Sequence, residues 1–282
     1  MNHADGYLEF RHSKARGSSR LYQQSWTPEK DVRAGILLVH GLGEHSSRYT
    51  HVAEHLTERG FAVHTLDHYG HGKSEGQPGY VERFSVFLDG VTALLHKVQS
   101  ENPEQPLFLV GHSMGGLIAA AFLLEQQAAF RACVLSGPAI KSDQAPPAIV
   151  VALIRLIAVL VPTAPLIQLD ASGVSRDPDV VKAYMNDPLV HHGKLSARLL
   201  SEMSATMKGT LAKAGDIRIP ILLMHGDADL LTAPSGSVEL HAKVGSDDKT
   251  LILYPGLFHE IFNEPEQQAV LAELSSWLEA RL

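Results

Sequence analysis

The sequence has little cysteine, no long uncharged apolar run and no excess of positive charge. Its 282 residues include a single cysteine, Cys133, so an internal disulfide framework is excluded. No stretch reaches the roughly 18 apolar residues of a membrane-spanning helix. Lys and Arg number 24 against 31 Asp and Glu, and this net charge of −7 argues against a broad nucleic-acid-binding surface.

The overall composition is that of an ordinary globular protein, with 45 % hydrophobic and 20 % charged residues. At about 150 residues per domain, the length predicts one large domain or a domain that carries an insertion. Residues 1–20 are polar and lack the apolar core of a secretion signal. We therefore expect a cytoplasmic protein, with peripheral contact at a membrane surface left open.

Short apolar runs alternate with helical patterns, which is typical of an α/β fold with a mostly parallel sheet. The expected buried strands are residues 35–39, 62–66, 107–110, 133–135, 219–224 and 250–253. Residues 7–10 and 21–24 are expected to form an edge hairpin. The expected helices are residues 49–59, 86–99, 114–127, 237–244 and 266–281.

Residues 138–211 break this alternation, because they contain no clear strand. They do contain an apolar stretch, residues 148–161, between Pro147 and Pro162. As a helix it would be about 21 Å long, too short for a bilayer core of about 30 Å. It is either a helix buried in its own domain or part of a lid whose apolar outer face can touch a membrane or micelle surface or admit a lipid chain.

The segment 107–116 predicts a strand, a Gly-x-Ser-x-Gly turn and a helix, which is the arrangement of a nucleophile elbow. A sharp turn at Ser113 would present its hydroxyl above the edge of the sheet. Gly111 and Gly115 would leave the space that side chains two positions away would otherwise occupy. This context indicates a catalytic serine rather than a simple glycine-rich turn. It also favours the second reading of residues 148–161, a lid that covers the active site.

A serine needs a histidine base, and the histidine needs a carboxylate that fixes its tautomer. In this architecture the chain order is serine, acid, histidine, each after a strand. Among 16 histidines, His225 precedes the acidic candidates, whereas His259 follows the last expected strand and is the predicted base. Asp227 and Asp229 both follow the strand 219–224; Asp229 is better placed, and Asp227 has the usual position of a turn residue.

Two backbone amides are expected to stabilise the oxyanion of an acyl-transfer reaction. One is that of Met114, directly after the nucleophile, and the other is that of Leu42, between two glycines in the loop after the strand 35–39. The polar segment 67–74 either braces this loop through hydrogen bonds or is a satisfied surface turn.

Three motifs together resemble the monoacylglycerol lipase family of α/β-hydrolase serine enzymes. The resemblance extends from about residue 35 to the end and includes residues 186–189. The motifs are His40-Gly41-x-Gly43-Glu44-His45-Ser46-x-Arg48-Tyr49, Asp67-His68-x-Gly70-His71-Gly72-x-Ser74-Glu75-Gly76 and Gly111-His112-Ser113-Met114-Gly115-Gly116.

The resemblance implies an α/β-hydrolase core at residues 1–137 and 212–282, with a helical cap at 138–211 inserted between two late strands. It implies hydrolysis of a small lipid ester, a monoacylglycerol, to glycerol and a fatty acid. The family's Gly-x-Ala-Asp loop falls on residues 226–229, so Asp229 is the implied acid. The alcohol end is expected near Glu44, Arg48 and Tyr184.

One position departs from the resemblance. Some relatives carry a second histidine three residues after the catalytic one, where this chain has Phe262. No cofactor is implied, and the histidines do not have zinc-ligand spacing.

A general carboxylesterase, a lysophospholipase or a thioesterase would use the same residues. A non-catalytic lipid-binding protein would require a broken triad, and all its parts are present here.

Overall fold

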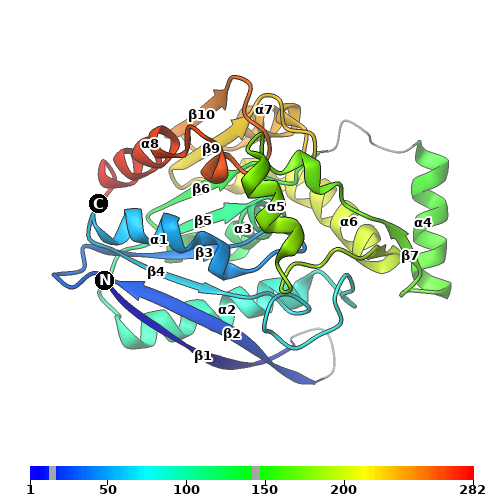
Figure 1. The fold of residues 1–282 in the computed structure, drawn as a ribbon, viewed down its shortest axis with the longest axis horizontal. Helices are drawn as coiled ribbons and strands as arrows, with labels where there is room; N and C mark the ends of the chain where they lie inside the picture. The colour runs from blue at the N-terminus through cyan, green and yellow to red at the C-terminus, as the bar shows by residue number, and fades with distance from the viewer. Residues whose placement is uncertain (13–16, 142–146) are drawn as a thin grey trace.

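A computed structural model of the chain describes residues 1–12, 17–141 and 147–282. Its centre is an eight-stranded sheet in the order β1-β2-β4-β3-β5-β6-β9-β10 (Figure 1). Six neighbouring strands of this sheet, β4, β3, β5, β6, β9 and β10, are parallel to one another. In contrast, β2 is antiparallel to β4 and β1 is antiparallel to β2. The expected mostly parallel α/β sheet is confirmed.

The central strands are buried along their whole length, as their continuous apolar sequences predict. These strands are β3 (Ala34–Val39), β4 (Phe61–Leu66), β5 (Leu107–His112), β6 (Ala132–Ser136) and β9 (Ile221–Gly226). The edge strand β10 (Lys249–Tyr254) is only partly buried. The hairpin of β1 (Asn2–Arg11) and β2 (Ser18–Thr27) is longer than predicted, because its flanking polar residues also pair.

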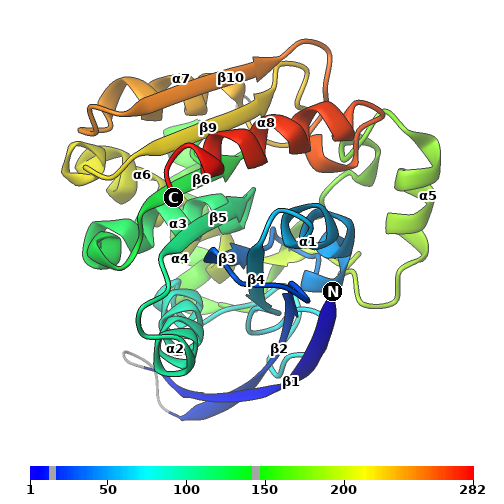
Figure 2. The ribbon, with the colours of Figure 1, turned by 90° about the vertical axis from the view of Figure 1, so that its left-hand side faces the viewer.

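Helices cover both faces of the sheet, so the core has two layers (Figure 2). One face carries α1 (Thr50–Thr57) and α8 (Gln267–Glu279). The other carries α2 (Ser85–Glu101), α3 (Met114–Gln126) and α7 (Pro234–Lys243). Cys133, the one cysteine of the sequence, is buried inside β6 as a free thiol.

The segment between β6 and β9 forms the insertion. It contains α4 (Ala148–Leu160), α5 (Pro178–Asn186) and α6 (Ala197–Lys213). The prediction that it holds no strand is wrong, because β7 (Pro165–Ile167) pairs with β8 (Leu195–Ser196) in a small antiparallel sheet. Both strands are too short to give a recognisable alternation of apolar and polar residues.

Helix α6 joins the insertion to the rest of the molecule. Its residues Leu199 and Met203 belong to the same buried cluster as Leu117 of α3. The predicted boundary at residues 211 and 212 therefore lies within the last turn of a helix that packs on the core.

Helix α4 stands at one end of the molecule, beside α6 (Figure 1). Its apolar side chains are largely exposed: Ile149 is 77 % exposed, Val159 is 72 % exposed and Leu160 is 70 % exposed. Of the two readings of this stretch, the structure thus agrees with an exposed apolar face. No helix in the described ranges has both the length and the apolar character required to cross a membrane.

Candidate active site

Ser113 occupies a strained turn between β5 and α3. Its φ is 54° and its ψ is −119°, and it is the only non-glycine residue with positive φ in the described ranges. Such a conformation costs of order 1–3 kcal/mol and persists where the surroundings enforce it. Here the Ser113 amide donates to the Ser136 carbonyl over 2.9 Å, and the Leu117 amide donates to the Ser113 carbonyl. The expected strand, sharp turn at Ser113 and helix are therefore present.

The two glycines that flank the serine allow this turn. A Cβ on Gly115 would lie 2.1 Å from the carbonyl oxygen of Val39, and one on Gly111 would lie 2.4 Å from the carbonyl oxygen of Gly115. Both distances are far below ordinary contact. The side-chain-free backbone therefore lets α3 begin directly against β3 and beneath the serine.

His259 and Asp229 are hydrogen-bonded to each other and buried. His259 Nδ1 donates to Oδ2 of Asp229 over 2.6 Å. The other carboxylate oxygen, Oδ1, accepts the amides of Leu231 and Thr232 at 2.7 and 3.0 Å. These amides fix the carboxylate, which in turn fixes the orientation and the tautomer of the imidazole.

The electrostatics of this pair follow from burial and opposite charge. Burial opposes protonation of His259, but the charge of Asp229 and its hydrogen bond raise the pKa of His259 above the ordinary value. Burial would raise the pKa of Asp229, yet His259 and the donors around the carboxylate hold that pKa far below its usual range. Asp229 is therefore an anion at neutral pH, and it stabilises an imidazolium at residue 259.

His259 lies over the turn that carries Ser113. Its ring centroid is 4.7 Å from that of His112, the residue before the serine. A Cβ on Gly137 would come within 3.3 Å of His259 Nδ1, and the residue before Gly137 accepts the Ser113 amide. The loops after β5, β9 and β10 thus meet at one edge of the sheet with Ser113, Asp229 and His259.

The loop after β3 approaches the serine from the other side. A Cβ on Gly41 would lie 3.1 Å from Cβ of Ser113, which places Leu42 next to the nucleophile. Within the described residues, the amides of Leu42 and Met114 have no protein acceptor. Both predicted oxyanion donors are therefore available.

The segment after β4 braces this loop, as one of its two readings predicted. The His68 amide donates to Nε2 of His40 over 3.0 Å, and His68 Nε2 donates to the His40 carbonyl over 3.1 Å. Asp67 accepts the amide and the hydroxyl of Ser46 at 2.8 and 2.5 Å. His40 holds its own loop, because its Nδ1 donates to the Gly41 carbonyl over 2.8 Å.

The three residues expected near the alcohol end of the substrate lie together. Arg48 donates to Oε2 of Glu44 over 2.8 Å, and its guanidinium carbon is 4.7 Å from the centre of the Tyr184 ring. A Cβ on Gly43 would lie 3.9 Å from the Tyr184 hydroxyl, which places that hydroxyl beside the Leu42 loop. Phe262, which stands where some relatives have a second histidine, is buried in the core and is not part of this group.

Residues 174–191, here called the bridging segment, connect the insertion to two of these loops. At one end, the Glu260 amide donates to the Val174 carbonyl over 2.8 Å. At the other, His45 Nε2 donates to Asp187 over 2.9 Å, and the His191 amide donates to the Gly43 carbonyl over 2.7 Å. The bridging segment therefore contacts both the loop of His259 and the loop of Leu42.

Sequence reasoning missed several residues that support the site. His225, which was not expected to be the base, donates to Asp229 over 3.0 Å and accepts from Ser237 over 2.7 Å. Thr232 donates to Asp229 over 2.9 Å. Glu260 binds Arg48 with both of its oxygens. Position next to an expected triad residue was the only signal for Glu260, whereas nothing in the sequence indicated the partners of His225.

Asp227 stabilises a turn, as its position predicted, because its carboxylate accepts the Gly256 amide over 2.6 Å. Among the described residues, no group of three or more His, Cys, Asp or Glu side chains is arranged to hold a metal ion.

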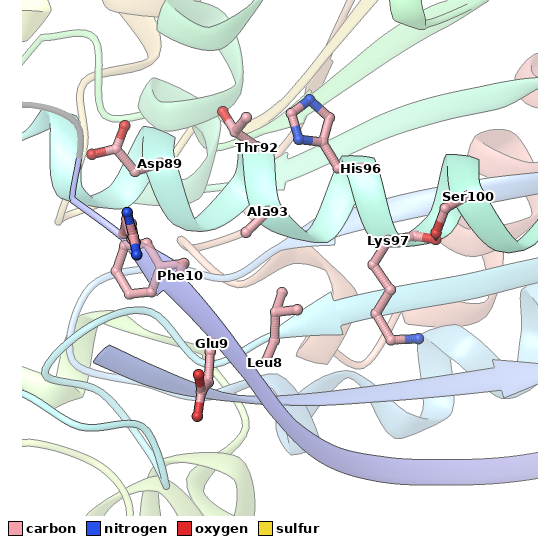
Figure 3. Close-up of a pocket in the computed structure, with 10 residues that line it drawn as sticks. Leu8, Glu9, Phe10, Asp89, Thr92, Ala93, His96, Lys97 and Ser100 are labelled. Atoms are coloured by element: carbon pink, nitrogen blue, oxygen red, sulfur yellow. The ribbon is translucent and has the colours of Figure 1, made fainter. Parts of the chain in front are cut away.

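Two surface hollows lie outside the triad. One, of about 640 Å³, lies between β1 and α2 and is lined by residues such as Phe10, Thr92 and Lys97 (Figure 3). The other, of about 540 Å³, lies in the insertion and includes Tyr184 and His192. Neither is lined by Ser113, Asp229 or His259, which are buried.

Comparison with known proteins agrees with this geometry. The family model Hydrolase_4, described as serine aminopeptidase, S33, matches residues 30–266. A monoacylglycerol lipase of Mycolicibacterium smegmatis is 40 % identical over 266 residues, which are 94 % of this chain and 95 % of that protein. A monoglyceride lipase of Rattus norvegicus is 31 % identical over 279 residues, 98 % of this chain and 92 % of that protein.

Solved structures give the same result. The crystal structure of Paleococcus ferrophilus monoacylglycerol lipase superposes with a TM-score of 0.85 at 32 % identity, over 93 % of this chain and 99 % of that one. The chain is therefore a hydrolytic enzyme and belongs to the monoacylglycerol lipase family of α/β-hydrolases.

Proposed function

We propose that this enzyme hydrolyses monoacylglycerols to glycerol and a free fatty acid. The observation that carries the proposal is the hydrogen bond of 2.6 Å between His259 and Asp229, over the strained turn of Ser113. The names of the relatives supply the substrate class, since the M. smegmatis and R. norvegicus proteins are named as lipases of monoacylglycerols.

In the proposed mechanism, the Ser113 hydroxyl attacks the ester carbonyl while His259 accepts its proton and Asp229 stabilises the imidazolium. The amides of Leu42 and Met114 bind the oxyanion of the tetrahedral intermediate, a contribution of about 2.7–4 kcal/mol for each donor. The imidazolium then protonates the departing glycerol oxygen. Water repeats the sequence on the acyl-enzyme and releases the fatty acid.

The two ends of the substrate are assigned to different surroundings. We assign the alcohol end to the neighbourhood of Glu44, Arg48 and Tyr184, which are close to the Leu42 loop. The acyl chain would lie beneath a cap formed by residues 138–211. Apolar side chains support this assignment, because Leu42 packs against the buried cluster that includes Leu199 and Met203 of α6.

We further propose that the cap contacts a membrane or micelle surface through α4, from the cytoplasmic location expected above. Its exposed apolar residues support this, because a contiguous apolar face on a soluble protein usually marks an interaction site. They are Ile149, Val150, Leu153, Leu156, Val159 and Leu160, and Val161 directly after the helix is exposed as well.

The experiment that tests the reaction compares purified protein with its Ser113→Ala variant on a panel of esters. Products released from 1- and 2-monoacylglycerols, a lysophospholipid, an acyl thioester and short ethyl esters are identified by mass spectrometry. We expect glycerol and fatty acid from monoacylglycerols at the highest rate, and no turnover with Ser113→Ala.

A fluorophosphonate probe provides the control that is independent of substrate. We expect it to label the unaltered protein and not the folded Ser113→Ala variant. Turnover or labelling that survives Ser113→Ala contradicts the assignment of the nucleophile. Faster turnover of lysophospholipid, thioester or ethyl ester contradicts the assignment of the substrate.

A further inference from the structure

One arginine connects the loop of the oxyanion donor to the loop of the histidine. Arg48 Nη1 donates to Oε2 of Glu44 over 2.8 Å and to Oε1 of Glu260 over 2.5 Å, and Nη2 donates to Oε2 of Glu260 over 2.7 Å. Glu44 and Glu260 are 216 residues apart in the chain, so the ion pairs join distant parts of the sequence. Arg48 is itself almost buried, with its side chain 11 % exposed.

Each carboxylate is also fixed to a backbone position of the active site. Oε1 of Glu44 accepts the Gly41 amide and the Tyr49 hydroxyl, both at 2.6 Å, and Gly41 directly precedes Leu42. Glu260 directly follows His259, and its Oε2 accepts the Asn263 side-chain amide over 2.8 Å. A shift of either carboxylate would therefore displace a group that the mechanism needs.

The cluster also carries an unbalanced negative charge. In all the hydrogen bonds described above, the carboxylate oxygens of Glu44 and Glu260 are acceptors, as expected for ionised carboxylates. One guanidinium, that of Arg48, thus faces two carboxylates. Burial would raise the pKa of Glu260, but Arg48 lowers it, which keeps this residue ionised. Burial and the charge of Glu260 raise the pKa of Glu44 against the attraction of Arg48.

This negative charge lies next to His259. The titratable groups that face His259 are Asp229, His112, Glu260 and Glu44, with Arg48 between the two glutamates. His112 is buried, and burial and the nearby His259 lower its pKa to about 3, so it is neutral. After Asp229, Glu260 and Glu44 are the groups whose charge favours the imidazolium.

We propose that Glu260 is a positioning residue: through Arg48 and Glu44 it clamps the loop of His259 to the loop of Leu42 and supplies negative charge beside the imidazolium formed during turnover. The inference rests on the proposed function, since it assigns Glu260 a part in that same reaction. It acts through His259 and the Leu42 amide, not by touching the ester.

The test measures kcat and KM over pH 5–9 for a soluble, uncharged p-nitrophenyl ester with the full-length protein and three variants. For Glu260→Gln, we expect kcat to fall roughly tenfold or more, because small displacements of catalytic groups are costly, with KM nearly unchanged. The acidic midpoint of kcat/KM should move to lower pH by roughly half a unit to one unit, because a neighbouring negative charge is lost.

Two further variants separate charge from support. Glu260→Asp keeps the charge but withdraws the carboxylate from Arg48, so kcat should fall while the midpoint stays. Glu264→Gln neutralises a buried carboxylate on the same loop that binds Arg176 at 2.9 Å, and it should leave the midpoint unchanged. Thermal unfolding establishes that each variant is folded at the assay temperature.

An unshifted midpoint in Glu260→Gln, or an equal shift in Glu264→Gln, overturns the electrostatic part of the proposal. Unaltered kcat in Glu260→Asp overturns the clamp, and this outcome remains decisive even if Glu260→Gln does not fold. Hydrolysis by the unaltered protein in the same assay reports on the proposed function separately, so the two failures are distinguishable.

Discussion

Asp229 and His259 are 30 residues apart in the chain, yet His259 Nδ1 lies 2.6 Å from Oδ2 of Asp229. Their strands, β9 and β10, are adjacent and parallel, so the loops that follow them leave the sheet at the same edge. Asp229 is held by amides of its own loop. The imidazole is consequently oriented before a substrate arrives.

Replacing this carboxylate should leave a folded but nearly inactive enzyme. Asp229→Asn puts an amide next to Nδ1 that can donate a hydrogen bond and favour the wrong tautomer, so kcat should fall by about 10⁴. The matched control is Asp227→Asn, two residues earlier, whose carboxylate serves the Gly256 turn. Steady-state kinetics on a p-nitrophenyl ester measure both, and an equal loss in the two variants would refute the assignment of the acid.

The pH dependence of kcat/KM should show an acidic limb from His259. The free enzyme needs this residue neutral to accept the serine proton, and its pKa is raised chiefly because Asp229 outweighs the effect of burial. A raised pKa moves the onset of activity to higher pH. The midpoint should therefore exceed the ordinary histidine value of about 6.5; a profile with its midpoint below that value would count against this site geometry.

Gly115→Ala should destabilise the protein and reduce activity. The added methyl group would lie 2.1 Å from a backbone oxygen of β3, and overpacking of this kind typically costs about 1–3 kcal/mol. Gly209→Ala in α6 is the control, since a methyl group there meets nothing within 4 Å. This substitution replaces a poor helix former by a good one, so the free energy of unfolding should rise by up to about 1 kcal/mol. Urea unfolding should give changes of opposite sign.

Polar substitutions on α4 should weaken binding to lipid without affecting the chemistry. Leu153→Ser with Leu156→Ser removes two half-exposed apolar side chains, and the loss of about 1 kcal/mol each predicts roughly thirtyfold weaker binding. Sedimentation with phosphatidylcholine vesicles measures this effect, and hydrolysis of a water-soluble ester should be unchanged.

The control for α4 is Val238→Ser, a residue of similar exposure on another helix, α7. It should bind vesicles as the unaltered protein does. Equal binding by the α4 double variant would show that this helix is not the contact surface.

Local sequence patterns were sufficient to predict the sheet and the triad loops, because buried parallel strands have continuous apolar runs and catalytic residues follow them. The hairpin was underestimated because β1 is a mostly exposed edge strand. Helix α5 was not predicted, although Asp177 caps its amino end and Pro178 occupies its first turn, the usual signals of a helix start.

The supporting residues could not be predicted in the same way. Glu260 meets Arg48 across 212 residues of chain, and His225 meets Asp229 and Ser237 only after β9 and α7 have packed. Such contacts depend on how the loops lie against one another. Residue type and spacing carry no record of that arrangement.

Different parts of the insertion contact different parts of the molecule, and this has a consequence for how the enzyme can be altered. The hydrogen bonds to the two catalytic loops come from the bridging segment, residues 174–191, whereas α4 packs beside α6. Redesigning α4 to meet other lipid interfaces is therefore separable from retuning the rate. Changes to the bridging segment, by contrast, will displace the loops of Leu42 and His259 and so slow hydrolysis whatever the acyl chain.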